Sequence, residues 1–145
     1  MTPLSAHLAL AFSAFLSATL LPGSSEAALL LFTTQHPQHI HSLLVVATLA
    51  NVLGSCLNYA MGRGLAAPLL QTWLGGPSDA KIRGKWWFQR FGAWSLLLAW
   101  VPIIGDPLTV IAGAMKIPFT HFLVLVGLGK AARYAMLLLG AAALN

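Results

Sequence analysis

Residues 102–107 of this chain read Pro102-Ile103-Ile104-Gly105-Asp106-Pro107, a break that combines two prolines, a glycine and an acid inside an apolar sequence. Phe91 to Val101 precedes the interruption, and the eight residues from Leu108 to Met115 follow it. Neither side alone reaches the roughly 20 residues that a helix needs to cross a bilayer. Non-helical backbone at membrane depth must be buried in protein or face a watery cavity. The stretch therefore predicts a broken, re-entrant helical hairpin rather than a simple transmembrane span.

A second interruption, Pro22-Gly23-Ser24-Ser25, is followed by the apolar run from Glu26 to Phe32, which is also too short to cross a membrane. Each break ends in a residue type that favours the start of a helix as its N-cap, Ser25 in the first and Asp106 in the second. We therefore expect two hairpins in which a short helix begins inside the membrane. Paired broken segments in two halves of a chain point to the binding site of a transporter.

Composition assigns the rest of the chain to the membrane. The 145 residues are 58% hydrophobic and 8% charged, whereas a typical soluble domain carries about 25% charged residues. The sequence thus predicts an all-α integral membrane protein with a single domain, residues 1–145. Its first half covers about residues 1–64, a loop covers about 65–90, and its second half covers about 91–145.

Four segments approach or exceed the length of a membrane-crossing helix. The first has no basic region before it and no small-residue cleavage pattern after it, so we expect a retained membrane segment rather than a signal peptide. The third is interrupted by the break described above. The predicted segments are Leu4–Leu21, Ser42–Met61, Phe91–Met115 and Phe119–Leu144.

Positive charge sets the predicted orientation. Residues 62–90 contain five of the eight basic residues and one acid, whereas residues 33–41 contain no lysine or arginine. Cytoplasmic loops of membrane proteins are enriched in these residues, so 62–90 is expected to be cytoplasmic and 33–41 external. Interleaving with Trp86 and Trp87 is typical of a membrane interface rather than a nucleic-acid site. The five basic residues are Arg63, Lys81, Arg83, Lys85 and Arg90.

The two halves of the chain resemble each other. Each break has a proline followed four residues later by an acid, Glu26 in the first half and Asp106 in the second. The helices that follow share a further pattern in the same order, which predicts an inverted repeat of the two re-entrant hairpins. This pattern is Gly54-x-x-x-Asn58-Tyr59-Ala60-Met61 in the first half and Gly129-x-x-x-Arg133-Tyr134-Ala135-Met136 in the second.

Four ionisable residues are predicted at membrane depth, where each charge costs about 2.5 to more than 10 kcal/mol. Lys130 and Arg133 lie near the middle of the last segment on one helical face, and Glu26 and Asp106 lie at the hairpin tips. We expect the acids and bases to pair inside the bundle. In the functional interpretation the acids take up protons and the bases bind an anionic head group. In the structural interpretation the pairs only lock the helices together.

Asn58 and Arg63 complete the candidate set for substrate binding and proton coupling. Asn58 shares a helical face with Asn51, and both are suited to hydrogen bonds across helices. Arg63 marks the inner membrane interface and is a candidate for contact with substrate. Gly54 and Gly62 are expected to let helices approach closely.

The sequence contains no serine or cysteine catalytic set, no phosphate-binding loop and no dinucleotide fingerprint. His36, His39 and His41 are close in sequence, but no cysteine or acid lies near them, so we expect no metal site. Cys56 is the only cysteine, which excludes an intramolecular disulfide. We therefore expect no enzyme activity, no cofactor and no nucleic-acid partner.

The chain resembles the DedA family, the bacterial branch of proteins with SNARE-associated or VTT domains. The resemblance covers nearly the whole chain and is closest to the small YqaA-like members. It rests most on the motif of residues 105–108, Gly-Asp-Pro-Leu, and on the motif of residues 54–63, Gly-x-x-x-Asn-Tyr-x-x-Gly-Arg. The stretches that carry it are residues 20–26, 47–63 and 100–113.

This resemblance implies a multi-pass protein of the bacterial inner membrane with two opposed re-entrant hairpins. It implies a lipid or lipid phosphate as partner, of the undecaprenyl phosphate or phospholipid class, and proton coupling through membrane acids such as Glu26. Two arginines that the better-studied branch carries at its second hairpin are replaced here by Ala99 and Gly105. Lys130 and Arg133 are the candidates to supply the missing positive charge. A homodimer is kept as an alternative to a monomer.

Two classes of function agree with these features. The first is a flippase-like transporter of an anionic lipid or lipid phosphate, with the buried charges lining its site. The second is a non-transporting membrane scaffold or envelope-integrity factor, in which the buried charges are structural. A membrane enzyme is disfavoured because no nucleophile–base pair is found in the sequence.

The predicted topology is testable by cysteine labelling in a Cys56→Ala background. Ser78→Cys should react with a membrane-impermeant maleimide in inverted vesicles but not in intact cells, because residues 62–90 carry most of the positive charge. Ser24→Cys and Ile104→Cys, one in each break, should be labelled from opposite sides of the membrane, as two opposed hairpins require.

Gln38→Cys, in the segment expected to be external, is the matched control and should be labelled in intact cells. Labelling of Ser78→Cys from outside intact cells would refute the orientation. Labelling of both breaks from one side would refute the inverted repeat.

Overall fold

The computed structural model describes residues 2–19, 23–66, 90–101 and 105–143, and within these ranges the chain is helical without any strand. The predicted all-α architecture is therefore confirmed. The elements in chain order are α1 (Pro3–Thr19), α2 (Ser24–Gln35), the 3-10 turn η1 (Pro37–His39), α3 (Ile40–Met61), the π-helical turn η2 (Gly62–Ala66), the 3-10 helix η3 (Gly92–Trp100), α6 (Gly105–Ala114) and α7 (Phe119–Ala143).

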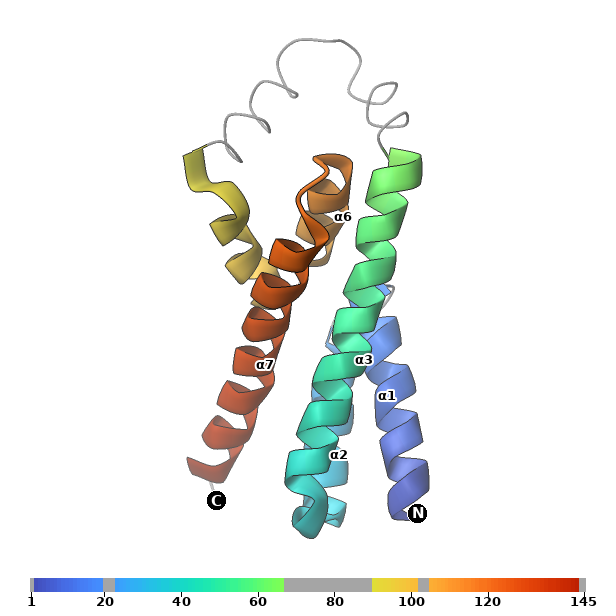
Figure 1. The fold of residues 1–145 in the computed structure, drawn as a ribbon. Helices are drawn as coiled ribbons and strands as arrows, with labels where there is room; N and C mark the ends of the chain where they lie inside the picture. The colour runs from blue at the N-terminus through green and yellow to red at the C-terminus, as the bar shows by residue number, and fades with distance from the viewer. Residues whose placement is uncertain (1, 20–22, 67–89, 102–104, 144–145) are drawn as a thin grey trace.

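Two long helices, α3 and α7, run in opposite directions, and two pairs of shorter elements pack on them (Figure 1). α1 and α2 run antiparallel beside the lower half of α3, whereas η3 and α6 run antiparallel near the upper end of the molecule. α1 packs mainly on α3 and η3 packs mainly on α7, while α6 lies against both α3 and η3. The two short pairs therefore approach the middle of the molecule from opposite ends.

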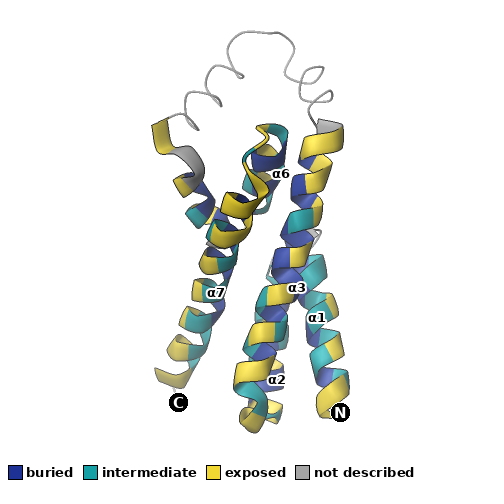
Figure 2. Ribbon diagram, viewed as in Figure 1, coloured by how far each residue is buried: buried dark blue, intermediate teal, exposed yellow. Residues whose placement is uncertain are grey.

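The surface of α3 is apolar where it faces away from the other helices. Large side chains that are 45% to 62% exposed recur there at every fourth position, namely Val45, Leu49, Leu53, Leu57 and Met61. The packed side is small or polar, with buried Ala47, Asn51, Gly54, Ser55 and Asn58. Exposed and buried residues follow the same division along α7 (Figure 2). Large apolar groups outside and small or polar groups inside suit a helix surrounded by lipid rather than by water.

The predicted membrane segments correspond closely to the helices. Among the described residues, α3 with its flanking turns (Pro37–Gly64) and α7 are long and apolar enough to cross a membrane. The predicted interruption of the third segment is confirmed, since η3 ends at Trp100 and α6 begins at Gly105. The first part of this segment is a nine-residue 3-10 helix instead of an α-helix, although 3-10 runs longer than about four residues are uncommon. Packing against α7 and α6 supports it.

The predicted N-caps of the two short helices are wrong. α2 is preceded by Gly23, whose φ of 93° is a left-handed conformation that favours glycine. Ser25 therefore lies inside the first turn, where its hydroxyl donates to Ser17 Oγ at 3.1 Å. α6 also begins before Asp106, and the Asp106 carboxylate pairs with another helix instead of capping its own. The segment Pro102 to Ile104, which was expected to form the second break, lies outside the described residues.

Two asparagines of α3 hold α1 in place, which confirms that this face makes hydrogen bonds across helices. Asn51 Nδ2 donates to the carbonyl oxygen of Ala14 at 2.8 Å, and Asn58 Nδ2 donates to that of Ala18 at 2.7 Å. In a continuous helix the Ala18 carbonyl would accept from residue 22, but Pro22 has no N–H to donate. Asn58 therefore supplies the missing donor in surroundings where water cannot.

α6 is in backbone contact with α3 and with η2, the turn that follows α3. A Cβ atom at Gly62 would meet the carbonyl oxygen of Val110, and one at Gly113 would meet that of Tyr59. Because both neighbours are backbone atoms, neither could move aside without shifting a helix. The expected close approach at Gly62 is confirmed, and Gly54 approaches α1 in the same way.

Gly113→Ala should lower the stability of the detergent-solubilised protein by about 1–3 kcal/mol, the usual cost of overpacking. The measurement is the midpoint of thermal unfolding. Gly127→Ala is the matched control in another helix, because a Cβ there would meet no atom within 4 Å and alanine is the better helix former. Equal midpoints for the two variants would contradict the backbone contact between α3 and α6.

Candidate functional site: two buried ion pairs on α7

The middle of α7 carries two basic side chains one turn apart, Lys130 and Arg133. Both point into the protein: the Lys130 side chain is 2% exposed and the Arg133 side chain is 14% exposed. Their spacing of three residues places them on the same helical face. Because a charge at this depth is costly, each base requires an acid from another element.

Glu26, in the first turn of α2, is the partner of Arg133. Arg133 Nε donates to Glu26 Oε1 at 2.5 Å, and Nη2 lies 2.5 Å from the same oxygen. Nη2 is buried, and its hydrogens are not aligned with an acceptor among the described residues. The N-terminal end of α2 also favours the negative charge of Glu26. This arrangement leaves part of the guanidinium fork able to bind a further acceptor.

Asp106, in the first turn of α6, is the partner of Lys130. Lys130 Nζ lies 3.2 Å from Asp106 Oδ1 and also donates to Asn51 Oδ1. The Asn51 amide in turn donates to the Ala14 carbonyl of α1. A continuous polar chain therefore connects α6, α7, α3 and α1 through the interior of the bundle.

A second polar chain lies next to Arg133. Tyr134, 2% exposed, donates from its hydroxyl to Ser25 Oγ at 2.8 Å, and Ser25 donates to Ser17 Oγ at 3.1 Å. These contacts connect α7 with α2 and α1 directly beside the Glu26–Arg133 pair. The first turn of α2 is thus held to α7 by both an ion pair and a hydrogen bond.

Four of the six residues in the predicted set come together as two ion pairs, Glu26 with Arg133 and Asp106 with Lys130. The other two lie elsewhere. Asn58 hydrogen-bonds to α1, and Arg63 is exposed beyond the end of α3, where its Nη1 donates to Tyr59 Oη at 3.0 Å. The predicted pairing of the two acids with the two bases is therefore observed, whereas a role of the six residues in substrate binding or proton coupling stays a prediction.

Asn51, Ser25 and Tyr134 belong to the site but were not in the predicted set. Asn51 had a signal in the sequence, since it shares a face with Asn58. Tyr134 also had one, because the repeat pairs it with Tyr59, whose hydroxyl donates to the Ile117 carbonyl at 2.5 Å. Ser25 gave no signal beyond its suitability as a cap.

The described residues do not bring three histidine, cysteine or acidic side chains into an arrangement that could hold a metal ion. The site instead contains an ammonium, a guanidinium, two carboxylates and an amide. These groups are suited to binding anions and exchanging protons.

A family of known membrane domains matches this chain. The description of that family is VTT domain, and its sequence model matches residues 21–142, a range that includes both ion pairs. The chain belongs to the VTT-domain (DedA) family. Together with the apolar surface of α3 and α7, this makes it a VTT-domain membrane protein.

Relatives of this VTT-domain protein are found in several bacteria. Inner membrane protein YqaA of Escherichia coli (strain K12) is 40% identical over 122 residues, which cover 84% of this chain and 81% of that protein. An uncharacterized protein of Haemophilus influenzae is 35% identical over 136 residues, covering 87% and 81%. An alkaline phosphatase-like protein of Lactococcus lactis subsp. cremoris is 29% identical over 106 residues, covering 67% and 50%. No solved structure matches the chain.

Breaking one ion pair should destabilise the VTT domain more than removing it entirely. Asp106→Ala leaves the Lys130 ammonium buried without a carboxylate, which should cost about 3–5 kcal/mol. The double variant Asp106→Ala with Lys130→Met should recover most of that loss in thermal unfolding. Lys116→Met, at an exposed lysine, serves as the control and should change stability by less than about 0.5 kcal/mol. A double variant no more stable than Asp106→Ala would show that Lys130 is not neutralised by Asp106.

Proposed function

We propose that this protein is a flippase-like transporter of the bacterial inner membrane. Its substrate would be an anionic lipid or lipid phosphate of the undecaprenyl phosphate or phospholipid class, and its transport would be coupled to protons. The observation that supports this most is the pair of buried ion pairs on α7, each formed with an acid in the first turn of a short helix. Ionisable groups at membrane depth commonly mark substrate and proton pathways.

We further propose that the two halves form an inverted repeat of re-entrant hairpins, with residues 62–90 on the cytoplasmic side. In this assignment α1 corresponds to η3, α2 to α6, and α3 to α7. Support comes from the antiparallel short pairs, which approach the middle of the molecule from opposite ends (Figure 1), and from the matching places of Glu26 and Asp106 in their helices. The names of the Escherichia coli and Shigella flexneri relatives support an inner-membrane location. The labelling of the two breaks tests this arrangement.

The chemistry of transport would depend on competition for Arg133. A phosphate monoester presents several oxygens, so it can accept from both Nε and Nη2, whereas Glu26 offers a single oxygen to both. A phosphate that displaces Glu26 would leave that carboxylate without its cation, and proton uptake by Glu26 would then follow. Lys130 would contribute a second positive charge one turn away.

The alternative is a non-transporting scaffold or envelope-integrity factor. The observation that favours it is that the ion pairs and their neighbours already connect α1, α2, α3, α6 and α7. Replacing a buried pair with apolar residues is often tolerated structurally. A scaffold should therefore retain its role in the variant Asp106→Ala with Lys130→Met, whereas a transporter should fold and be inserted but fail to move its substrate.

Arg133→Gln should reduce the rate of lipid phosphate movement in proteoliposomes by at least about tenfold, since it removes a charge-assisted interaction of roughly 1.5–3 kcal/mol. Arg133→Lys should also be impaired because the planar fork is lost. The assay follows a labelled lipid phosphate from one leaflet to the other at matched protein content. Lys116→Gln, which changes an exposed cation outside the site, should transport normally. An unchanged rate in Arg133→Gln would exclude the proposed site.

A further inference from the structure

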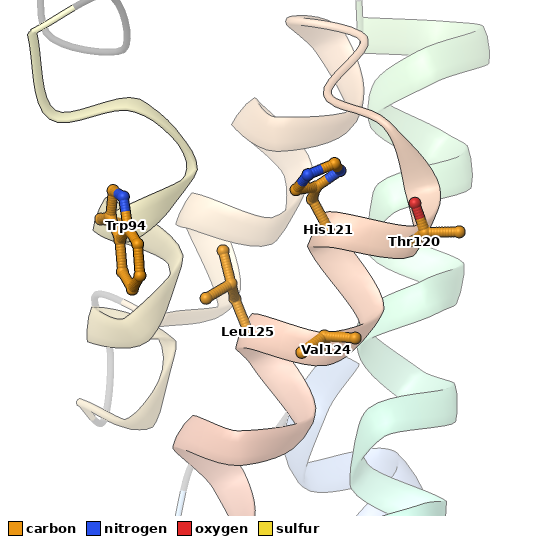
Figure 3. A pocket seen from close by; sticks show the side chains of 5 residues that line it. All are labelled: Trp94, Thr120, His121, Val124 and Leu125. Carbon is orange, nitrogen blue, oxygen red and sulfur yellow. The ribbon is translucent and has the colours of Figure 1, made fainter.

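A cavity of about 450 Å³ lies between η3 and α7 (Figure 3). Trp94 forms one wall from η3, and four residues of α7 form the other: Thr120, His121, Val124 and Leu125. The cavity opens to the outer surface of the protein, since Trp94 is 72% exposed and Val124 is 59% exposed. We call it the η3–α7 groove. None of its lining residues belongs to the candidate site described above.

The groove is apolar along its length and polar at one end. Trp94, Val124 and Leu125 line it mainly with hydrocarbon and an aromatic ring, and their one polar side-chain group is the indole N–H of Trp94. Thr120 and His121 lie in the first turn of α7. The 25 residues of α7 span roughly 37 Å, which exceeds the ~30 Å hydrocarbon core, so its first turn reaches the head-group level. An amphiphile with its chain in the hydrocarbon and its head at the interface fits this division.

The charge at the polar end favours an anionic head group. Lys116, which is exposed, lies in the turn that leads into α7. Lys116 adopts a left-handed conformation (φ 56°) because it caps the C-terminal end of α6, where its N–H donates to the Gly113 carbonyl at 3.0 Å. The two acids among the described residues, Glu26 and Asp106, are engaged with the middle of α7. These two carboxylates therefore belong to the ion pairs and not to this end of the groove.

We propose that the η3–α7 groove binds one anionic glycerophospholipid from the leaflet next to residues 62–90. One acyl chain packs against Trp94, Val124 and Leu125, and the phosphate accepts hydrogen bonds from Thr120 and His121. The bound lipid is a resident ligand and not the transported one, because the groove shares no residue with the ion pairs. It fills the outer side of η3, a long 3-10 helix that otherwise packs mainly on α7 and α6.

The test uses the intrinsic fluorescence of Trp94 in the full-length chain with its other tryptophans changed to phenylalanine. The protein is reconstituted in phosphatidylcholine with a small fraction of either phosphatidylglycerol or phosphatidylcholine brominated on the acyl chain. Brominated phosphatidylglycerol should quench Trp94 about fivefold more efficiently, the size of one favourable cation–anion contact at a membrane surface. The substitutions are Trp73→Phe, Trp86→Phe, Trp87→Phe and Trp100→Phe.

Lys116→Gln should abolish the preference for phosphatidylglycerol while leaving contact with the acyl chain, because both lipids present a phosphate and only phosphatidylglycerol has a net negative charge. The double variant Thr120→Ala with His121→Ala should weaken the binding of both lipids, because it removes the hydrogen bonds to the phosphate. His41→Ala, an exposed histidine near the start of α3, is the matched control and should leave the preference intact. Native mass spectrometry of the otherwise unchanged chain provides a second measurement if the tryptophan variants do not fold. It should show one retained phosphatidylglycerol that the double variant loses.

Equal quenching by the two brominated lipids would mean that only ordinary surrounding lipid touches Trp94, and would overturn the proposal. A preference that survives in Lys116→Gln would also overturn it, because the anionic head group would then be bound elsewhere. Quenching that falls as protein concentration rises would identify a second copy of the chain as the occupant. All of these measurements are made without transport, so they are independent of the proposed function.

Discussion

Charge neutralisation inside the bundle is the constraint on which the arrangement of the elements depends. Lys130 and Arg133 cannot reach water from the middle of a helix as long as α7, and each must therefore meet an acid within the protein. The acids come from the first turns of α2 and α6, so each of these short helices must begin at the depth of its partner on α7. The breaks that precede α2 and α6 are thus required by the positions of two bases far along the chain.

The same absence of water explains the composition of α3. Its packed face combines residues small enough to let α1 and α6 approach with amides that bind exposed backbone, as Asn58 does at the Ala18 carbonyl. Asn51 has two partners, the Lys130 ammonium and the Ala14 carbonyl, so the neutralisation of α7 and the attachment of α1 depend on one side chain. Large apolar residues are left to the outer face, where lipid surrounds them.

Much of this was predictable from the sequence because prolines and charges are rare in apolar segments and therefore informative. The breaks near Pro22 and Pro102, the long helices and the pairing of acids with bases follow from where those few residues stand. The assignment of Glu26 to Arg133 and Asp106 to Lys130 does not follow, because spacing defines a helical face but not the element opposite it. For the same reason the sequence does not show that Arg63 contacts Tyr59 and not the ion pairs, or that Asn51 accepts from Lys130. The 3-10 form of η3 could not be predicted from the sequence either, because the same apolar run is compatible with either type of helix.

The 3-10 geometry of η3 changes the length that this segment covers. Nine residues rising about 2.0 Å each cover about 18 Å, whereas the same residues in an α-helix would cover about 13–14 Å. The 3-10 form therefore makes this segment about 4–5 Å longer than its α-helical form would be. Nine residues are thus enough for η3 to follow α7 over roughly three α-helical turns, which is the contact on which its packing mainly depends.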